Sequence, residues 1–391
     1  MTKKEVYLLN CIDCGTPFFT EGEKLFYESH HLCMPKRCKK CRTNKKRESK
    51  GKQTDETDKD WFLKENLEID QLLQTLPYRQ VTKEEIVVDT PKHTLYVIGN
   101  GFDLMHGIPS SYYSFRDFLG KHSSLRSALE NWNMKGNLWA DFEDSLAHMD
   151  DTSMLNTIPD MMDILGVLDE DDADFSAANY FIAAEMAIEP LGTIERELPI
   201  KFKSWINTLK VSETFKPLTT LLNNESYFLN FNYTEFLETL YDVKKENVLY
   251  IHGDRRVKNK NLILGHAPGA EFDPLYDYNA KEPAPHNQTE FDLYETTNTY
   301  ISHYYDATEK KSPEIIRQNQ DYFKNLSDIR KIITVGHSLS VVDYPYFLEI
   351  KHYASKTPTW ILGWHSSGDL RRINAFVKTM GLDSRDVLLY K

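Results

Sequence analysis

The sequence predicts an α/β protein with a doubly wound, mostly parallel sheet, a helical insertion and a small cysteine-bearing N-terminal module. Three observations carry this prediction. Apolar runs of strand length alternate with helical segments along residues 93–391. Five of these runs end directly at small or polar residues. All five cysteines of the 391-residue chain lie between Cys11 and Cys41.

Composition sets the broad class. At 391 residues, the chain is long enough for two or three modules. Its 40% of apolar residues is enough for a substantial core. Its formal net charge of −12 argues against a protein that binds nucleic acid over its whole surface. Residues 1–52 hold 13 Lys and Arg against 6 Asp and Glu, or +7, whereas the rest hold 34 against 53, or −19. A basic N-terminal module therefore precedes an acidic body.

The sequence has no stretch typical of a membrane or secreted protein. No apolar run approaches the roughly 20 residues of a membrane span. The first residues, MTKKEVYLLNC, contain no long apolar segment of a signal peptide. The cysteine spacing fits a metal site in a reducing compartment better than a disulfide framework. We therefore expect a cytoplasmic protein with no membrane partner.

Two Cys-x-x-Cys pairs, separated by 23 residues, predict a metal site formed by Cys11, Cys14, Cys38 and Cys41. Thiolates three positions apart on a tight turn reach one ion at about 2.3 Å, and two such pairs complete a tetrahedron. Four sulfur ligands leave no open coordination position. We therefore predict structural rather than catalytic Zn²⁺.

Three further candidate ligands, Cys33, His30 and His31, lie between the pairs, and we expect them in local packing or in solvent rather than on the metal. The segment resembles a known small family of probable zinc-binding domains, through Cys11–Gly15, Phe18–Thr20 and Pro35–Arg42. The resemblance covers about the first 45 residues. It implies a zinc-ribbon-like metal fold for residues 1–45 and little about partners.

Residues 46–92 are predicted to form a charged linker and a helix. Residues 43–60 lack apolar side chains, which is typical of a flexible linker. Apolar positions between Trp61 and Leu76 then favour a helix that leads into the main domain. The basic residues near the second cysteine pair raise nucleic-acid contact as an alternative, although a solvated linker is the more common outcome.

The main domain, residues 93–391, is predicted to be organised around a glycine turn. An apolar run at residues 95–98 has the composition of a buried strand and breaks at Gly99-Asn100-Gly101. Two glycines let the backbone turn sharply and approach a ligand. A helix opening at Phe102 would point free N–H groups at an anion. Leu104 stands where the dinucleotide fingerprint has its third glycine, so a tight turn without a ligand stays the alternative.

A helical insertion at about 120–225 precedes the remaining strands, because that block has few strand signals and residues 177–210 favour a long helix or a helix pair. The predicted strands cover residues 227–231, 248–251, 262–264, 331–335, 359–362 and 386–390. Thr234 is expected to cap a helix that begins near Glu235. Residues 267–290 predict a loop or lid.

Five strand ends point to one site: the glycine turn, Asn232-Tyr233-Thr234, His252-Gly253, Gly336-His337-Ser338 and Gly363-Trp364-His365. In open α/β sheets, ligands bind outside the carboxyl ends of the strands. Singly, each ending is more often a turn or a packed side chain, but five at one edge favour a functional cluster. Asn232 and His252 are our catalytic candidates. Asp103 is either a ligand contact or a helix cap, and His106, Glu143 and His337 rank second.

A series of motifs in the main domain resembles the AbiH family of bacterial phage abortive-infection proteins. The matching residues, all in the expected order, are Ile98–Asp103, Gly107, Ser111-Tyr112, Trp139, Phe142-Glu143, Asn230–Thr234, Ile251–Gly253, Gly336–Ser340 and Asp343–Phe347. The resemblance covers roughly residues 93–391. It implies anti-phage defence by abortive infection.

The same motifs are similar, more remotely, to the sirtuin-like (SIR2) NAD-consuming fold, a Rossmann-like sheet. That similarity implies catalytic roles for Asn232 and His252. It also implies that NAD⁺ contacts Gly99, Asn100, Gly101, Phe102, Asp103, Gly253, Gly336 and Ser338. Thr234 stands where the sirtuin pattern has Asp, and no four-cysteine module interrupts the predicted sheet. These departures argue against a protein deacylase.

The chemistry that fits these residues is hydrolysis of NAD⁺ to nicotinamide and ADP-ribose. The leaving nicotinamide is already cationic, so the site needs a base and ribose contacts rather than a strong acid. His252, with an unperturbed pKa near 6.5, would take a proton at neutral pH. Asn232 would bind ribose hydroxyls or the water.

Two alternatives stay open at the level of sequence. In the first, the pocket is a non-catalytic sensor of NAD⁺ or an ADP-ribose derivative. In the second, the protein is a nucleic-acid-acting toxin that uses the basic zinc module, although no carboxylate pattern for a Mg²⁺ nuclease stands out. A phage trigger and a homo-oligomer are expected by analogy alone.

Overall fold

The computed structural model describes residues 7–10, 17–20, 63–88, 90–165, 176–211, 215–270 and 288–391, and the chain divides into units 1–75 and 76–391. In the first unit, β1 (Tyr7–Asn10) pairs antiparallel with β2 (Pro17–Thr20). Residues 63–75 form a helix, as their apolar pattern predicts. The four predicted zinc ligands lie outside the described residues, and the first pair falls between β1 and β2 in the sequence.

The second unit is built on a parallel seven-stranded sheet in the order β3-β9-β8-β7-β4-β5-β6. This confirms the predicted doubly wound α/β class. The strands are β3 (Arg79–Gln80), β4 (Thr94–Ile98), β5 (Tyr227–Asn230), β6 (Val248–Tyr250), β7 (Lys331–Val335), β8 (Thr359–Gly363) and β9 (Val387–Tyr390).

The central strands are apolar because helices cover the sheet. All five residues of β4 are buried, as are four of the five residues of β7. A parallel strand covered on both faces needs a continuous apolar run rather than an alternating one. Phe347 and Phe376, on two covering helices, contact each other and Trp360 of β8 with ring centroids 4.9–6.4 Å apart.

The strand order reverses beside β4. From β4 the chain moves to β5 and β6 on one side, and it then returns to β7, β8 and β9 on the other. Six of the strands therefore follow the Rossmann order, extended at one edge by β3. In such sheets, ligands bind outside the carboxyl ends of the strands at the point of reversal. Here that point lies between the segments after β4 and β7.

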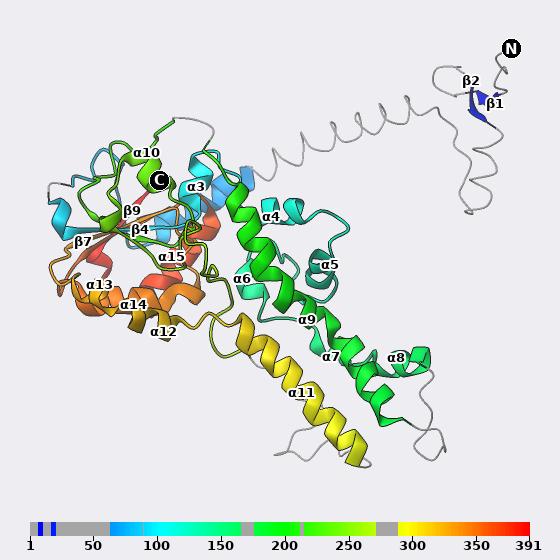
Figure 1. Cartoon of the computed structure of the whole chain (residues 1–391). Helices are drawn as coiled ribbons and strands as arrows, with labels where there is room; N and C mark the ends of the chain where they lie inside the picture. The colour runs from blue at the N-terminus through cyan, green and yellow to red at the C-terminus, as the bar shows by residue number, and fades with distance from the viewer. Residues whose placement is uncertain are drawn as a thin grey trace. The chain divides into compact units, whose positions relative to one another are not determined.

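Helices of the second unit surround the sheet and form a helical block beside it (Figure 1). Those connecting the strands are α3 (Gly101–Met105), α10 (Phe236–Tyr241), α12 (Ser312–Gln318), α13 (Gln320–Lys324), α14 (Tyr344–Tyr353) and α15 (Ser367–Met380). Short 3₁₀ turns among the described residues are η1 (Pro91–His93), η2 (Lys245–Asn247), η3 (Val341–Asp343) and η4 (Ser384–Asp386).

The helical block occupies most of the predicted insertion and is organised by one long helix. Helix α9 (Ala177–Thr208) contains Pro190 and Pro199 and yet continues through both, so the helix-pair alternative is wrong. Around it pack α4 (Tyr112–Leu119), α5 (Ser124–Asn131), α7 (Asp151–Leu155), α8 (Ile158–Leu165) and α11 (Gln288–Thr308). The short helix α6 (Phe142–Ser145) also belongs to this region. Within the described part of the chain, no helix has the length and apolarity that crossing a membrane requires.

Two strand assignments differ from the sequence-based expectation. Residues 262–264 do not form a strand. Their backbone instead bonds to neighbouring loops, because the N–H of Ile263 donates to the carbonyl of His252 at 2.8 Å and the carbonyl of Ile263 accepts from the Tyr233 hydroxyl at 2.8 Å. Strand β3 was not predicted, since its two exposed residues carry no apolar pattern.

The glycine turn after β4 packs directly on the segment after β7. The N–H of Gly101 donates to the carbonyl of Gly336 at 2.7 Å, and the N–H of Gly99 donates to the carbonyl of Val335 at 3.0 Å. A Cβ at Gly101 would lie 2.6 Å from the Gly336 Cα, and a Cβ at Gly336 would lie 2.3 Å from the Phe102 nitrogen. Gly336 also has a φ of +61°. These glycines thus permit contact between two backbones.

We predict that Gly336→Ala destabilises the protein much more than Gly381→Ala. Both glycines have a φ near +60°, so both substitutions carry the same left-handed backbone cost of about 1–2 kcal/mol. A Cβ at Gly381 meets only the Lys351 Nζ at 3.8 Å, whereas one at Gly336 overlaps backbone atoms. We expect an additional loss of about 1–3 kcal/mol in the free energy of urea unfolding for Gly336→Ala. Equal losses for the two variants would contradict the backbone contact.

Candidate functional site

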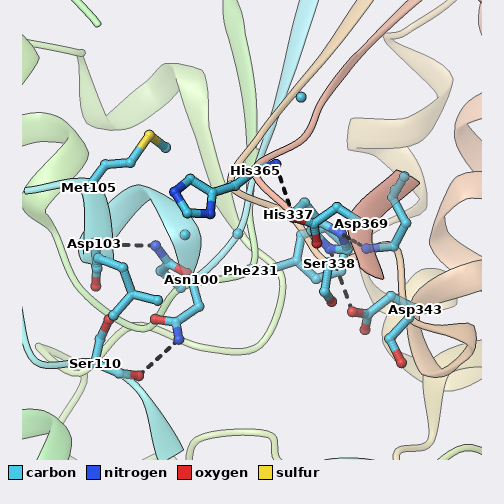
Figure 2. Close-up of a pocket in the computed structure, with 18 of the residues that line it drawn as sticks. Asn100, Asp103, Met105, Ser110, Phe231, His337, Ser338, Asp343, His365 and Asp369 are labelled. Atoms are coloured by element: carbon cyan, nitrogen blue, oxygen red, sulfur yellow. Dashed lines mark hydrogen bonds and ion pairs between the residues drawn. The ribbon is translucent and has the colours of Figure 1, made fainter. Parts of the chain in front are cut away.

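A cavity of about 1190 Å³ opens at the carboxyl ends of the parallel strands. All five predicted strand ends contribute lining residues, together with α6, η3 and α15. Figure 2 shows side chains from the segments after β4, β5, β7 and β8 gathered around this space. The five strand ends thus lie at one edge of the sheet and line one cavity, whereas their functional role stays a prediction.

Most of the predicted site residues line the cavity. These are Asn232, His252, Gly99, Asn100, Gly101, Asp103, Gly336 and Ser338, with Glu143 and His337 of the second rank. Phe102, Gly253 and His106 are not among the lining residues. His106 instead has a structural role, because its Nδ1 lies 2.7 Å from the carbonyl of Phe102 and its Nε2 lies 2.8 Å from the Tyr241 hydroxyl.

Asp103 connects the glycine turn to the segment after β5. It sits in the first turn of α3, where Asn100 occupies the N-cap position, so its cap alternative is wrong. Its carboxylate accepts from the Asn232 Nδ2 at 3.2 Å and from the Thr234 Oγ1 at 3.0 Å. Thr234 is therefore engaged with Asp103, and Glu235 takes the N-cap position of α10 in its place.

Burial raises the pKa of Asp103 to about 7, even though the hydrogen bonds from Thr234 and Asn232 act in the opposite direction. Asp103 as a whole is only 2% exposed to solvent. A carboxyl group with a pKa near neutrality, placed in a cavity, can gain or lose a proton at working pH, which is a common property of functional sites.

His252 lies at the end of β6 with its ring enclosed by aromatic side chains. Phe231 contacts the rings of both His252 and His337 edge-on, at centroid distances of 5.0 and 4.4 Å. Within the described residues, the Nε2 of His252 has no hydrogen-bond partner. The nearest carboxylate oxygen, Asp343 Oδ1, is 3.8 Å away. A buried polar atom without a partner is costly and indicates a place for a ligand or water.

The pKa of His252 lies well below its usual value, first because of burial and then because of the charge of Lys310. The expectation of an unperturbed pKa near 6.5 is therefore wrong. The consequence is that His252 is neutral at pH 7, which is the form that accepts a proton.

A buried charge cluster of Glu143, Lys310 and Asp343 forms one wall of the site. The Lys310 Nζ donates to Glu143 Oε2 at 2.7 Å and to Asp343 Oδ1 at 3.2 Å. Burial opposes the charged form of Lys310, but Asp343 and Glu143 outweigh it and raise its pKa. The Tyr112 hydroxyl donates to the other oxygen of Glu143 at 3.2 Å. Burial raises the pKa of both Glu143 and Asp343, and the neighbouring charge of Lys310 acts in the opposite direction.

His337 lies beside Oδ2 of Asp343, the carboxylate oxygen that does not bind Lys310. Its Nε2 is 3.5 Å from Asp343 Oδ2, and its Nδ1 accepts from the backbone N–H of Leu339 at 3.0 Å. Burial and the charge of Lys310 lower its pKa to about 3. A neutral ring that accepts at Nδ1 carries its proton at Nε2, so His337 presents an N–H to Asp343.

Sequence reasoning missed Lys310 completely and gave Asp343 no role. Lys310 follows α11 in a segment without a motif, and nothing in its neighbours distinguishes it from a surface lysine. Its side chain is nevertheless fully buried. Asp343 belongs to the motif 343–347, but only the fold places it between His337 of the same connection and His252, which follows β6.

We predict that Asp103→Asn removes a pH dependence of stability. The folded-state pKa near 7 exceeds the unfolded value of 3.8, so the folded state holds the extra proton and stability falls as pH rises between these values. The wild type should lose up to about 4 kcal/mol relative to Asp103→Asn between pH 4 and 8, as measured by urea unfolding. Thr234→Val keeps the carboxyl group and should keep the dependence. Parallel curves for wild type and Asp103→Asn would contradict the raised pKa.

Comparison with known proteins supports the metal module. Residues 7–50 match the family described as a probable treble clef domain. A treble clef is a zinc fold, so the match supports the expected zinc-binding module and describes it as a treble clef where a zinc-ribbon-like fold was expected. Thiolates are preferred ligands of Zn²⁺, so the donor set fits a structural zinc. Among the curated proteins and among the solved structures, nothing matches the chain.

We predict one Zn²⁺ per chain, bound by the four cysteines of the two pairs. Metal analysis of the purified full chain should give about one equivalent, and Cys38→Ser should lose it because three thiolates hold the ion less tightly. Cys33→Ser is the matched control and should retain the metal. Loss of zinc from Cys33→Ser with retention in Cys38→Ser would overturn the ligand assignment.

A second family match covers the sheet and its cavity. Residues 95–364 match the family described as Bacteriophage abortive infection AbiH. The match begins in β4, ends just beyond β8, and includes the five strand ends that line the cavity. The chain therefore belongs to the bacteriophage abortive infection AbiH family, which implies a role in anti-phage defence.

Proposed function

We propose that this AbiH-family protein acts in anti-phage defence by hydrolysing NAD⁺ to nicotinamide and ADP-ribose in the cavity at the strand ends. The observation that carries the proposal is the unpartnered Nε2 of the buried, neutral His252, which lines the same cavity as Asn232 at the reversal point of a Rossmann-ordered sheet. The motif similarity to the NAD-consuming sirtuin-like fold supports the choice of substrate.

The size of the cavity suits a dinucleotide. Its volume exceeds the roughly 300–1,000 Å³ of most small-molecule pockets. The lining also includes the cationic side chains of Lys83, Arg372 and Lys391. Arg372 comes from α15, donates to the Ser338 carbonyl at 3.0 Å and is paired with Asp369 at 2.6 Å. Positive side chains next to the strand ends provide donors for a pyrophosphate.

In the proposed reaction, the oxygen of a water molecule forms a bond to C1′ of the nicotinamide ribose. The bond from C1′ to the nicotinamide nitrogen breaks, and its electron pair leaves with neutral nicotinamide. The proton released by the water goes to His252, whose neutral ring accepts it. The Nδ2 of Asn232 is held by Asp103, which leaves its Oδ1 to accept from a ribose hydroxyl or the water.

The charge of the site suits this reaction. Positive charge develops on the ribose as the glycosidic bond breaks, and the carboxylate of Asp343, paired with Lys310, lies 3.8 Å from the His252 Nε2. A preorganised negative charge stabilises an oxocarbenium-like transition state more strongly than it stabilises the ground state.

We predict that purified protein releases nicotinamide from NAD⁺ and that Asn232→Ala and His252→Ala each reduce the rate by about 10²-fold or more. Nicotinamide is followed by chromatography, with and without phage-infected lysate as a source of the trigger. His106→Gln is the matched control, because it changes a buried histidine that does not line the cavity.

Release that persists in both cavity variants would contradict the assignment of the site. Absence of release from folded wild type, with and without infected lysate, would contradict NAD⁺ hydrolysis. If such a protein still bound NAD⁺, the non-catalytic sensor would become the better account.

A further inference from the structure

The contacts of Asp343 distinguish it from the other carboxylates of the cavity. One oxygen, Oδ1, lies 3.2 Å from the Lys310 Nζ and 3.8 Å from the His252 Nε2. The other oxygen, Oδ2, lies 3.5 Å from the His337 Nε2. Glu143 shares Lys310 with Asp343, but its second oxygen is taken by Tyr112. Asp343 is therefore the carboxylate that faces both histidines.

Three different segments hold Asp343 in place. It ends η3 and occupies the N-cap position of α14, so its backbone is fixed where a helix begins. Lys310 reaches it from the connection between α11 and α12. The N–H of His337, whose tautomer is set by Leu339, faces its free oxygen. A carboxylate held in this way has little freedom to turn away from His252.

The distance between Asp343 Oδ1 and the His252 Nε2 leaves room for a small movement of the His252 ring. At 3.8 Å, the two side chains are too far apart for a hydrogen bond, which needs about 2.7–3.2 Å. An approach of roughly 1 Å by the His252 ring would close the gap. Protonation of His252 supplies the attraction for such a movement, because imidazolium and carboxylate then form an ion pair in a buried environment.

We propose that Asp343, fixed by Lys310, is the positioning residue that orients His252 and stabilises its protonated form. For its catalytic meaning this inference rests on the proposed hydrolysis. Lys310 has the opposite electrostatic effect on His252, because its positive charge disfavours the protonated imidazole ring and lowers the pKa of His252. The pair thus keeps His252 neutral before the reaction and provides a counter-ion after it takes a proton.

Charged, titratable and aromatic side chains from several neighbouring elements surround His252. They are Asp343 from η3, Lys310 from the connection after α11, His337 from the segment after β7, and the rings of Phe231, Tyr233 and Tyr346. Glu143 forms an ion pair with Lys310, whereas the carboxylate paired with His252 is Asp343. Removal of Lys310 therefore leaves Asp343 as the dominant charge next to His252.

The test is an NMR titration of His252 in full-length protein labelled with ¹³C-histidine, with its signal assigned through His252→Gln. We expect Lys310→Met to raise the pKa of His252 by about 1–3 pH units. Lys310→Met/Asp343→Asn should abolish this rise, whereas Lys310→Met/Glu143→Gln should retain it. Both double variants remove the ammonium group and neutralise one buried carboxyl group of the cluster, so they are matched to each other and remain testable where the single variant fails to fold.

Equal His252 pKa values in the two double variants would overturn the proposal, as would a higher value in Lys310→Met/Asp343→Asn. The NMR titration measures the His252 pKa and needs no enzymatic turnover. A wrong role for Asp343 can therefore be told apart from an absence of NAD⁺ hydrolysis. In an active protein, the acidic limb of the kcat/KM profile should move with the His252 pKa across the same variants. A limb that stays fixed while the His252 pKa moves would show that His252 is not the base and would overturn the catalytic meaning of the pair.

Discussion

The contact between the backbone turns after β4 and β7 is the constraint on which the site depends. Gly99 and Gly101 pack on Gly336 so closely that a side chain on either segment would displace the other. The two turns follow β4 and β7, the neighbouring strands between which the strand order reverses. Their contact fixes where α3 begins and where His337 lies. Asp103, which follows the first turn, then reaches Asn232 and Thr234 beyond β5, so one contact sets the relative positions of three strand ends.

Much of the fold could be predicted from local patterns. Continuous apolar runs identify β4 and β7 because a strand covered on both faces needs them, and their polar endings identify the edge of the sheet where the cavity opens. Strand β3 and the non-strand at residues 262–264 could not be predicted in this way. In both cases, hydrogen bonding to backbone that is distant in the sequence decides the structure. The two exposed residues of β3 and the three apolar residues 262–264 do not encode such bonding.

The site was predictable in part for a related physical reason. Asn232 and His252 follow strands directly, so topology brings them to the cavity. The burial of Lys310 depends on Glu143 and Asp343, which lie far from it in the sequence, and no local pattern reveals such a cluster. The pKa of His252 was mispredicted for the same cause, because burial and a neighbouring ammonium are properties of the fold. Charge balance in a core is a long-range property, whereas strand periodicity is a local one.

In this AbiH-family protein, backbone contact sets the positions of the strand ends, and buried charges act on the protonation of the side chains between them. The central proposal is that NAD⁺ occupies the cavity. Isothermal titration calorimetry of NAD⁺ into His252→Ala tests this most directly, because that variant retains the cavity and lacks the proposed base. The account predicts one NAD⁺ per chain, with binding weakened by Arg372→Ala. Absence of binding by the folded variant at millimolar NAD⁺ would contradict it.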